Sequence, residues 1–270
     1  IGGRIEVYEF GYHRPSSVSE AVALLRGAED PKVMSGGQTL IPTLKQRLAQ
    51  PSDVVDLGGI ADLVGVREDG GTIVIGGMTT HAAVASSALV RGRIPGLASL
   101  AEGIGDPQVR NRGTIGGSIA NNDPASDYPG AVLALDAVVE TDRRELGADG
   151  FFTGMFETAL EADELVTAVR FPVPEKSAYA KFPNPASRYA VVGVMVAVTG
   201  GGVRVAVTGA GAVAYRWSEA EAALGGGLDA ASLDGLTVDP SALNADLHAS
   251  AAYRAHLVKV MATRAVQALV

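Results

Sequence analysis

The sequence contains no cysteine. A chain without cysteine cannot form a disulfide, a thiolate zinc site or a cysteine nucleophile, and it cannot hold an iron–sulfur cluster through cysteine ligands. Any metal cluster that works with this chain must therefore be bound by another chain.

The sequence also lacks an excess of positive charge and any apolar run long enough to span a bilayer. Its 22 Lys and Arg against 30 Asp and Glu give a formal net charge of −8 and a pI near 5.0. Because nucleic-acid binding depends heavily on contacts from Lys and Arg to phosphate, no nucleic acid is expected as a partner. Residues 1–4 lack the pattern of a secretory signal, so a cytoplasmic location is expected.

Several catalytic motifs are absent. There is no Gly-x-Ser-x-Gly, no phosphate loop ending in Gly-Lys-Ser/Thr and no Gly-x-Gly-x-x-Gly, which argues against a serine hydrolase, a P-loop NTPase and an NAD-binding Rossmann domain. The 4 histidines, at positions 13, 81, 248 and 256, have no metal-binding spacing, and each is interpreted as structural. We expect neither a metal site nor a catalytic residue in this chain.

The sequence does contain enough apolar residues to form a substantial core. It also contains two glycine-rich segments. Hydrophobic residues make up 47% of its 270 residues, a length that favours two domains or one domain with clear lobes. The first glycine segment is Ser35-Gly36-Gly37-Gln38-Thr39, and the second is Arg112-Gly113-Thr114-Ile115-Gly116-Gly117-Ser118. Glycine allows close approach of the backbone to a ligand, and the neighbouring hydroxyl and amide groups can bond to phosphate oxygens. Together the segments predict a diphosphate site formed mainly by backbone N–H groups.

The residues around the first glycine segment predict a strand–helix–strand unit. A strand over 32–34 leads into the segment, and a strand follows over 54–57. Between them, one face of a predicted helix carries Leu40, Ile41, Leu44 and Leu48. Before this unit we expect a strand over 5–10 and a helix over 17–25, where Ser17 and Glu20 fit a capping box. The glycine segment would lie at the carboxyl end of its strand, where open α/β sheets commonly bind ligands.

The rest of the chain divides at Pro172 and Pro174, which mark an expected lobe boundary. Before them the pattern predicts a hairpin around 68–71, short helices over 80–84 and 95–103, and strands at 138–140 and 165–171. After them it predicts strands over 190–199, 203–208 and 212–217. Helices over 219–224, 240–247 and 251–269 are expected to cover these strands.

Four side chains outside the glycine segments are candidates for ligand contact. Asp123 and Asp127 could each accept a hydrogen bond from a ribose hydroxyl, or could equally cap a helix. Lys181 is either a solvated charge at a strand end or a positive charge near a reduced cofactor. Tyr189 either packs between lobes or shields one face of a bound ring.

Taken together, these motifs resemble the FAD-binding medium subunit of molybdenum hydroxylases, the xanthine dehydrogenase family, and are most like carbon monoxide dehydrogenase medium chains. The resemblance rests on the run from Gly36 to Pro42 with Lys45, on 77–81 (Gly-Met-Thr-Thr-His), on the run from Asp106 to Ser118 and on 123–127. It implies an α+β chain with the FAD-binding fold of the vanillyl-alcohol-oxidase (PCMH) type. The expected parts are a small α/β lobe over 1–57, a larger mixed lobe over 58–172 and a C-terminal antiparallel sheet with helices over 173–270.

The resemblance also implies which residues contact noncovalently bound FAD between the first two lobes. Asp127 would lie on the ribose side, Val166 at an edge lined by backbone, and Lys181 near the flavin. The residues expected to line the diphosphate and the flavin or to touch the dinucleotide are Val33, Met34, Ser35, Gly36, Gly37, Gln38, Thr39, Leu40, Ile104, Thr114, Ile115, Gly116, Gly117 and Ser118.

In such enzymes the medium chain relays electrons, and the resemblance implies the same role here. A large subunit would hold molybdenum, a small subunit would hold 2Fe-2S clusters, and the whole would form a dimer of heterotrimers. Quinone, NAD or oxygen would accept the electrons, with association at the inner face of the membrane through the acceptor. Two alternatives stay open: a self-contained flavin oxidoreductase of this fold, and a noncatalytic nucleotide-binding assembly subunit.

Overall fold

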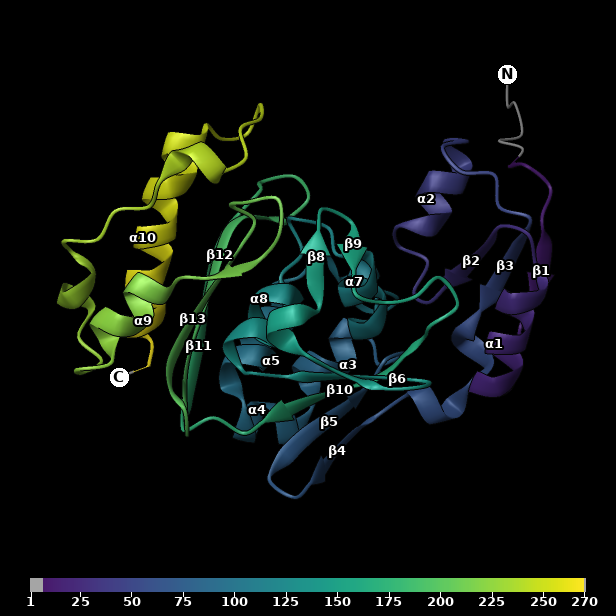
Figure 1. The fold of residues 1–270 in the computed structure, drawn as a ribbon, viewed down its shortest axis with the longest axis horizontal. Coiled ribbons are helices and arrows are strands. Elements are labelled where there is room, and N and C mark those ends of the chain that lie inside the picture. The colour runs from purple at the N-terminus through teal and green to yellow at the C-terminus, as the bar shows by residue number, and fades with distance from the viewer. Residues whose placement is uncertain (1–6, 270) are drawn as a thin grey trace.

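The computed structural model describes residues 7–269, whose elements form three lobes in a row (Figure 1). The N-terminal elements lie at one end of the molecule, and the last sheet with the long C-terminal helix lies at the other. Helices are combined with a parallel sheet and with antiparallel sheets, which confirms the predicted α+β class.

The first lobe is built on a small parallel sheet with the strand order β1-β3-β2. The predicted strand–helix–strand unit is confirmed, and the first glycine segment directly follows β2. Ser17 caps the first helix by accepting a hydrogen bond at Oγ from the Glu20 amide, 3.2 Å away. The elements are β1 (Gly11–His13), α1 (Val18–Gly27), β2 (Pro31–Met34), α2 (Leu40–Lys45) and β3 (Asp53–Asp56).

The first strand lies later in the chain than predicted. Residues 5 and 6 lie outside the described residues, 7–10 form no strand, and β1 covers 11–13 instead. Tyr12 donates a hydrogen bond of 2.6 Å to Asp56, and His13 Nε2 lies 2.7 Å from Asp53 Oδ1. These bonds to β3 favour pairing at 11–13, and they depend on residues 40 and 44 positions away in the sequence.

The middle lobe contains an antiparallel sheet with the order β4-β5-β10-β6-β7, a separate hairpin of β8 and β9, and most of the helices (Figure 1). The predicted hairpin and the strand at 165–171 are confirmed. Its strands are β4 (Val66–Asp69), β5 (Thr72–Gly76), β6 (Val138–Thr141), β7 (Glu145–Gly147), β8 (Phe152–Gly154), β9 (Glu157–Thr158) and β10 (Val166–Pro172). Its helices are α3 (His81–Ser86), α4 (Ala88–Arg93), α5 (Pro95–Glu102), α6 (Pro107–Arg110), α7 (Ile115–Asn121) and α8 (Tyr128–Ala134).

The second glycine segment contains the start of a helix and is more than the turn that the sequence suggests. Thr114 caps α7, because its Oγ1 accepts a hydrogen bond of 3.1 Å from the Gly117 amide. Ile115 and Ile119 of α7 are fully buried in the core of the middle lobe. The apolar side chains of α7 therefore fix the segment on the second lobe.

The C-terminal lobe has an antiparallel sheet with the order β11-β12-β13-β14. One face of β12 packs on the middle lobe through Met195 and Ala197, and the other face packs through Val194 and Val196 in the cluster that includes α10. Burial on both faces explains the continuous apolar run over 190–198. The elements are β11 (Lys176–Pro183), β12 (Ala190–Thr199), β13 (Gly202–Thr208), β14 (Tyr215–Arg216), α9 (Ser218–Leu224) and α10 (Ala251–Gln267).

Two predictions for this lobe are wrong. β11 forms a full strand that the sequence interpretation did not include. The helix predicted over 240–247 is only a short 3-10 turn, Pro240–Ala242, because the following backbone pairs elsewhere. Asn244 donates from its amide to Ala210 O at 2.8 Å and from Nδ2 to Gly211 O at 2.7 Å.

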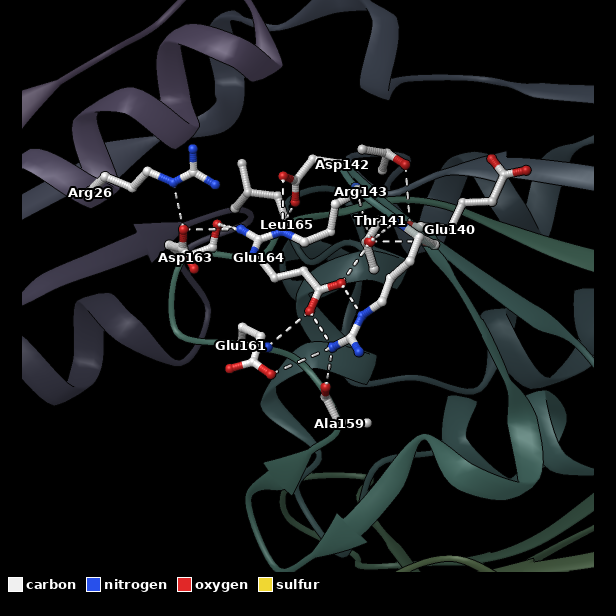
Figure 2. A network of polar contacts seen from close by, with 12 residues as sticks. Arg26, Glu140, Thr141, Asp142, Arg143, Ala159, Glu161, Asp163, Glu164 and Leu165 are labelled. Atoms are coloured by element: carbon white, nitrogen blue, oxygen red, sulfur yellow. Dashed lines mark hydrogen bonds and ion pairs between the residues drawn. The ribbon is translucent and has the colours of Figure 1, made fainter.

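A polar network connects the first lobe to the middle lobe (Figure 2). Arg26 of α1 reaches across to Asp163 with an Nε to Oδ2 distance of 2.7 Å, and Arg143 binds the same carboxylate. Arg144 makes a two-bond contact to Glu164, whose side chain has 0% exposure. The contact from Arg26 holds the lobe with the first glycine segment against the lobe with the second.

Candidate FAD-binding site

A cavity of about 460 Å³ lies where the first two lobes meet. It is lined by the first glycine segment and Leu40 from one lobe and by Gly113, Thr114, Gly117 and Ser118 from the other. The structure thus brings the two glycine segments to one cavity. Ile104, Asp123, Asp127 and Tyr189 also line it.

The first glycine segment presents free backbone donors. Within residues 7–269, no hydrogen bond is formed by the amides of Gly36, Gly37, Gln38 or Thr39. Gly37 has φ of +73°, a conformation that glycine adopts without the strain that other residues have there. The segment provides unpaired N–H groups beside the cavity, as a site for an anion requires.

In the second glycine segment the amides of 115–118 are bonded within the protein. Ile115 donates to Thr79 O at 3.1 Å and Gly116 to Gly77 O at 2.9 Å, while Gly117 and Ser118 donate to Oγ1 and O of Thr114. The backbone N–H groups predicted to bind a diphosphate are therefore free at 36–39 in the first segment, whereas those at 115–118 in the second segment are already bonded. Ile115 and Gly116 are buried in the lobe, so the groups that reach the cavity belong to Thr114, Gly117 and Ser118.

The two segments touch each other. Ser35 Oγ and Thr114 Oγ1 share a hydrogen bond of 2.6 Å. A Cβ atom on Gly36 would lie within 3.0 Å of the carbonyl oxygen of Arg112 and of Gly113 Cα, so only glycine fits between them. This glycine contact and the free amides fit a dinucleotide diphosphate, whose oxygens need close backbone donors.

Asp127 also lines the cavity, and its side chain is buried. Its Oδ1 accepts a hydrogen bond of 2.5 Å from Tyr179 and lies 2.9 Å from Lys181 Nζ. Burial raises the pKa of Asp127, and the charge of Lys181 and the bond from Tyr179 oppose this shift. Asp127 occupies the N-cap position of α8, as one interpretation predicts, but its side chain makes no capping bond to the helix. Asp123 Oδ1 instead accepts a turn bond of 2.8 Å from the Ala125 amide.

Lys181 is not the solvated charge at a strand end that one interpretation suggests. Its side chain is 9% exposed, and Nζ donates to Gly103 O at 2.8 Å and Arg188 O at 2.9 Å in addition to its ion pair with Asp127. Lys181 reaches the cavity only through Asp127, which lines it. Tyr189 is 48% exposed at the cavity, so its ring is accessible to a ligand.

Two other predicted site residues, Met34 and Val166, do not line the cavity. Met34 is the last residue of β2, directly before the first glycine segment in the sequence. Val166 is buried, and its carbonyl packs on Gly77, where a Cβ atom would lie within 3.0 Å of the oxygen. Ile104, in contrast, is 9% exposed and lines the cavity.

His81 and Tyr179 are side chains at the site that sequence reasoning did not select. His81 lines the cavity, is 5% exposed, and its Nδ1 is buried with no hydrogen-bond partner among the described residues. Burial and the nearby charge of Arg110 lower the pKa of His81 to about 4, so the ring is neutral at pH 7. The sequence feature that could have identified His81 is its place at the end of the 77–81 motif, directly after Thr79 and Thr80.

Residues 7–269 contain no group of three or more His, Asp or Glu side chains placed to hold a metal ion. Within the same residues, no helix is long and apolar enough to cross a membrane.

The comparisons with known proteins define the class. Residues 8–174 match the family described as FAD binding domain in molybdopterin dehydrogenase. The chain therefore belongs to the FAD-binding medium-subunit family of molybdenum hydroxylases, and the predicted PCMH-type fold is confirmed.

Particular relatives are carbon monoxide dehydrogenase medium chains. The chain is 39% identical to that of Afipia carboxidovorans over 96% of both chains, and 44% identical to that of Hydrogenophaga pseudoflava over 69% of this chain and 68% of the other. The solved structure of the Hydrogenophaga pseudoflava enzyme lacking the Mo-pyranopterin moiety contains a chain that superposes with a TM-score of 0.90 at 38% identity, covering 98% of each chain. This chain is thus similar over its whole length to oxidoreductase flavoprotein subunits, as the resemblance predicts.

Proposed function

We propose that this chain is the electron-transfer subunit of a molybdenum hydroxylase of the carbon monoxide dehydrogenase type. It binds FAD noncovalently in the cavity between the first two lobes, receives electrons from an iron–sulfur cluster of a partner chain and passes them to an external acceptor. The observation that carries the proposal is the row of unpaired amides at 36–39 beside the same cavity as Thr114 and Ser118.

Each part of the cavity suits one part of the dinucleotide. The amides of 36–39 and the hydroxyl groups of Thr114 and Ser118 suit the diphosphate, and the carboxylates of Asp123 and Asp127 suit ribose hydroxyls. Ile104 and the ring of Tyr189 offer apolar surface to the flavin. Bound FAD supplies the one- and two-electron redox chemistry, while the protein orients it, excludes water and sets its potential.

The partners follow from what this chain does not contain. A chain with no cysteine has no cysteine ligands for a 2Fe-2S cluster, so the electron donor belongs to a small partner subunit. The relatives are named medium chains, which supports a large subunit that holds molybdenum and a dimer of heterotrimers as the complete assembly. Substrate chemistry then takes place on the large subunit, and quinone, NAD or oxygen accepts the electrons in the cytoplasm or at the inner face of the membrane.

Purification of the chain with its partners, followed by flavin, iron and molybdenum analysis, tests this proposal. We expect one FAD per chain and reduction of that FAD by CO only when the other chains are present. A purified chain without flavin absorbance that also fails to bind added FAD would instead indicate a noncatalytic assembly subunit. Turnover of a simple organic donor by the isolated chain would indicate a self-contained flavin oxidoreductase.

A further inference from the structure

A buried polar cluster lies behind the cavity, where the middle lobe meets the C-terminal sheet. Asp127, Tyr179 and Lys181 form it, and the exposed fractions of the Asp127 and Lys181 side chains are 3% and 9%. Asp127 comes just before α8, whereas the other two residues point to it from β11. Tyr189 of the C-terminal lobe lines the cavity directly, and the cluster adds an indirect link from β11 to the cavity through the Asp127 carboxylate.

Gly193 makes room for Tyr179. In the register of β11 and β12, Tyr179 pairs with Met195, and Gly193 lies two residues away on the same strand face. A Cβ atom at residue 193 would lie within 3.0 Å of both Oη and Cζ of Tyr179. Glycine in the interior of a strand weakens the strand and commonly marks a close approach of another group. Here that group is the hydroxyl that binds Asp127.

The side-chain contacts to Asp127 are both made by one of its two oxygens. Oδ1 accepts from Tyr179 and pairs with Lys181, while no other described residue donates a hydrogen bond to Oδ2. Because Asp127 lines the cavity, Oδ2 is the oxygen that remains for a ligand. A hydroxyl group of the ligand is the matching donor.

We propose that Tyr179 is a positioning residue for FAD, whose hydroxyl, seated over Gly193, fixes the Asp127 carboxylate with Oδ2 toward a hydroxyl group of the bound dinucleotide. This inference rests on the proposed function and adds a residue of the C-terminal lobe to the FAD site. Tyr179 acts through Asp127 and does not line the cavity.

The hydrogen bond from Tyr179 also affects the pH dependence of FAD binding. The groups facing Asp127 are Tyr179 and Lys181 on β11, Tyr128 on α8 and, nearby, Asp123 and Tyr189. The bond from Tyr179 lowers the pKa of Asp127 against the effect of burial. Loss of that bond raises the pKa of Asp127. As the pH is lowered, the carboxylate then becomes protonated earlier, and the loss of FAD affinity in acid begins at a higher pH.

The test is FAD titration of the deflavinated full-length chain over pH 5 to 8, followed by flavin fluorescence. Tyr179→Phe keeps the ring over Gly193 and removes only the hydroxyl. We expect FAD affinity to fall about tenfold, the size typical of a lost hydrogen bond to a charged group, and its acid limb to move to higher pH. Gly193→Ala, which displaces the hydroxyl, should do the same.

Tyr215→Phe is the matched control, because the Tyr215 hydroxyl is also buried in the C-terminal sheet but has no partner among the described residues. Thermal unfolding reports whether each variant is folded. If Gly193→Ala does not fold, the result for Tyr179→Phe decides the test by itself. Affinity and pH profile of Tyr179→Phe equal to those of Tyr215→Phe would overturn the inference. Failure of the wild-type chain to bind FAD would overturn the proposed function instead.

Discussion

The two glycine segments look alike in sequence and differ in what their backbone does. The amides of 36–39 have no partner among the described residues and lie beside the cavity, whereas those of 115–118 are bonded to Gly77, Thr79 and Thr114. The first segment therefore leaves backbone donors available to a ligand, and Gly116 of the second allows close packing of α7 on the Gly77 turn. A glycine-rich pattern predicts that another group lies close to the backbone, but the segments packed around it decide whether that group is a ligand or another part of the protein.

The largest effect is expected where the segments meet, at Gly36. In Gly36→Ala the new methyl group would contact the backbone of 112–113, which cannot move aside as a side chain can. The segments must separate, and we expect FAD affinity to fall by tenfold or more, on the order of the cost of overpacking. FAD titration with a thermal unfolding scan measures this. Gly27→Ala in the same lobe is the control, because a Cβ atom there meets nothing within 4 Å.

Gly116→Val tests the packing role of the second segment. The side chain would press on Gly77 and displace the start of α7, so flavin occupancy and thermal stability should fall together, with a midpoint several degrees lower, as overpacking of about 1–3 kcal/mol implies. The C-terminal lobe should stay folded, as reported by fluorescence of Trp217, which is 4% exposed in that lobe. Unchanged occupancy would count against the assignment of this segment to the site, and Gly147→Val, at an open position, is the control.

Local patterns predicted the elements that local bonds specify. The helix cap at Ser17, the strand–helix–strand unit around Gly36 and the apolar strand at 190–199 all follow from neighbours in sequence, although Glu20 binds Ser16 and so does not complete the predicted capping box. The two glycine segments themselves predicted a joint site, and the resemblance implied that this site lies between the first two lobes. Neither source could show that Lys181 is buried or that Tyr179 lies over Gly193, because these contacts depend on the register of β11 and β12 and on their packing against Asp127.

A smaller effect is expected at the hydroxyl contact between the segments. Ser35→Ala and Thr114→Val each remove one side of the 2.6 Å bond, and each should weaken FAD binding by about fivefold, as for one net hydrogen bond of about 1 kcal/mol. Thr114→Val also removes the cap of α7 and should lower the unfolding temperature more. In a double-mutant cycle the double variant should bind FAD about as well as the weaker single variant. Fully additive effects would show that the segments act independently, and Thr114→Ser, which keeps the hydroxyl, is the control.

The smallest effect at neutral pH is expected from the network that holds the first segment's lobe in place. Hydrogen bonds from Arg144 lower the pKa of Glu164 to about 2, and bonds from Arg26 and Arg143 lower that of Asp163 to about 2. Both carboxylates have a lower pKa in the folded state than in the unfolded state, so the stability they add is present above about pH 4 and is lost as pH falls toward 2.

Glu164→Gln should therefore reduce the stability that is lost between about pH 4 and 2, measured by urea unfolding across this range.

Arg26→Ala should change FAD affinity by less than about twofold at physiological salt and by more at low salt, because the Arg26 side chain is 61% exposed and its ion pair is screened. Asp62→Asn, at an exposed carboxylate, should leave both profiles unchanged. An effect of Arg26→Ala on FAD affinity as large as that of Gly36→Ala would mean that the position of the first lobe, more than the contact between glycine segments, limits cofactor binding.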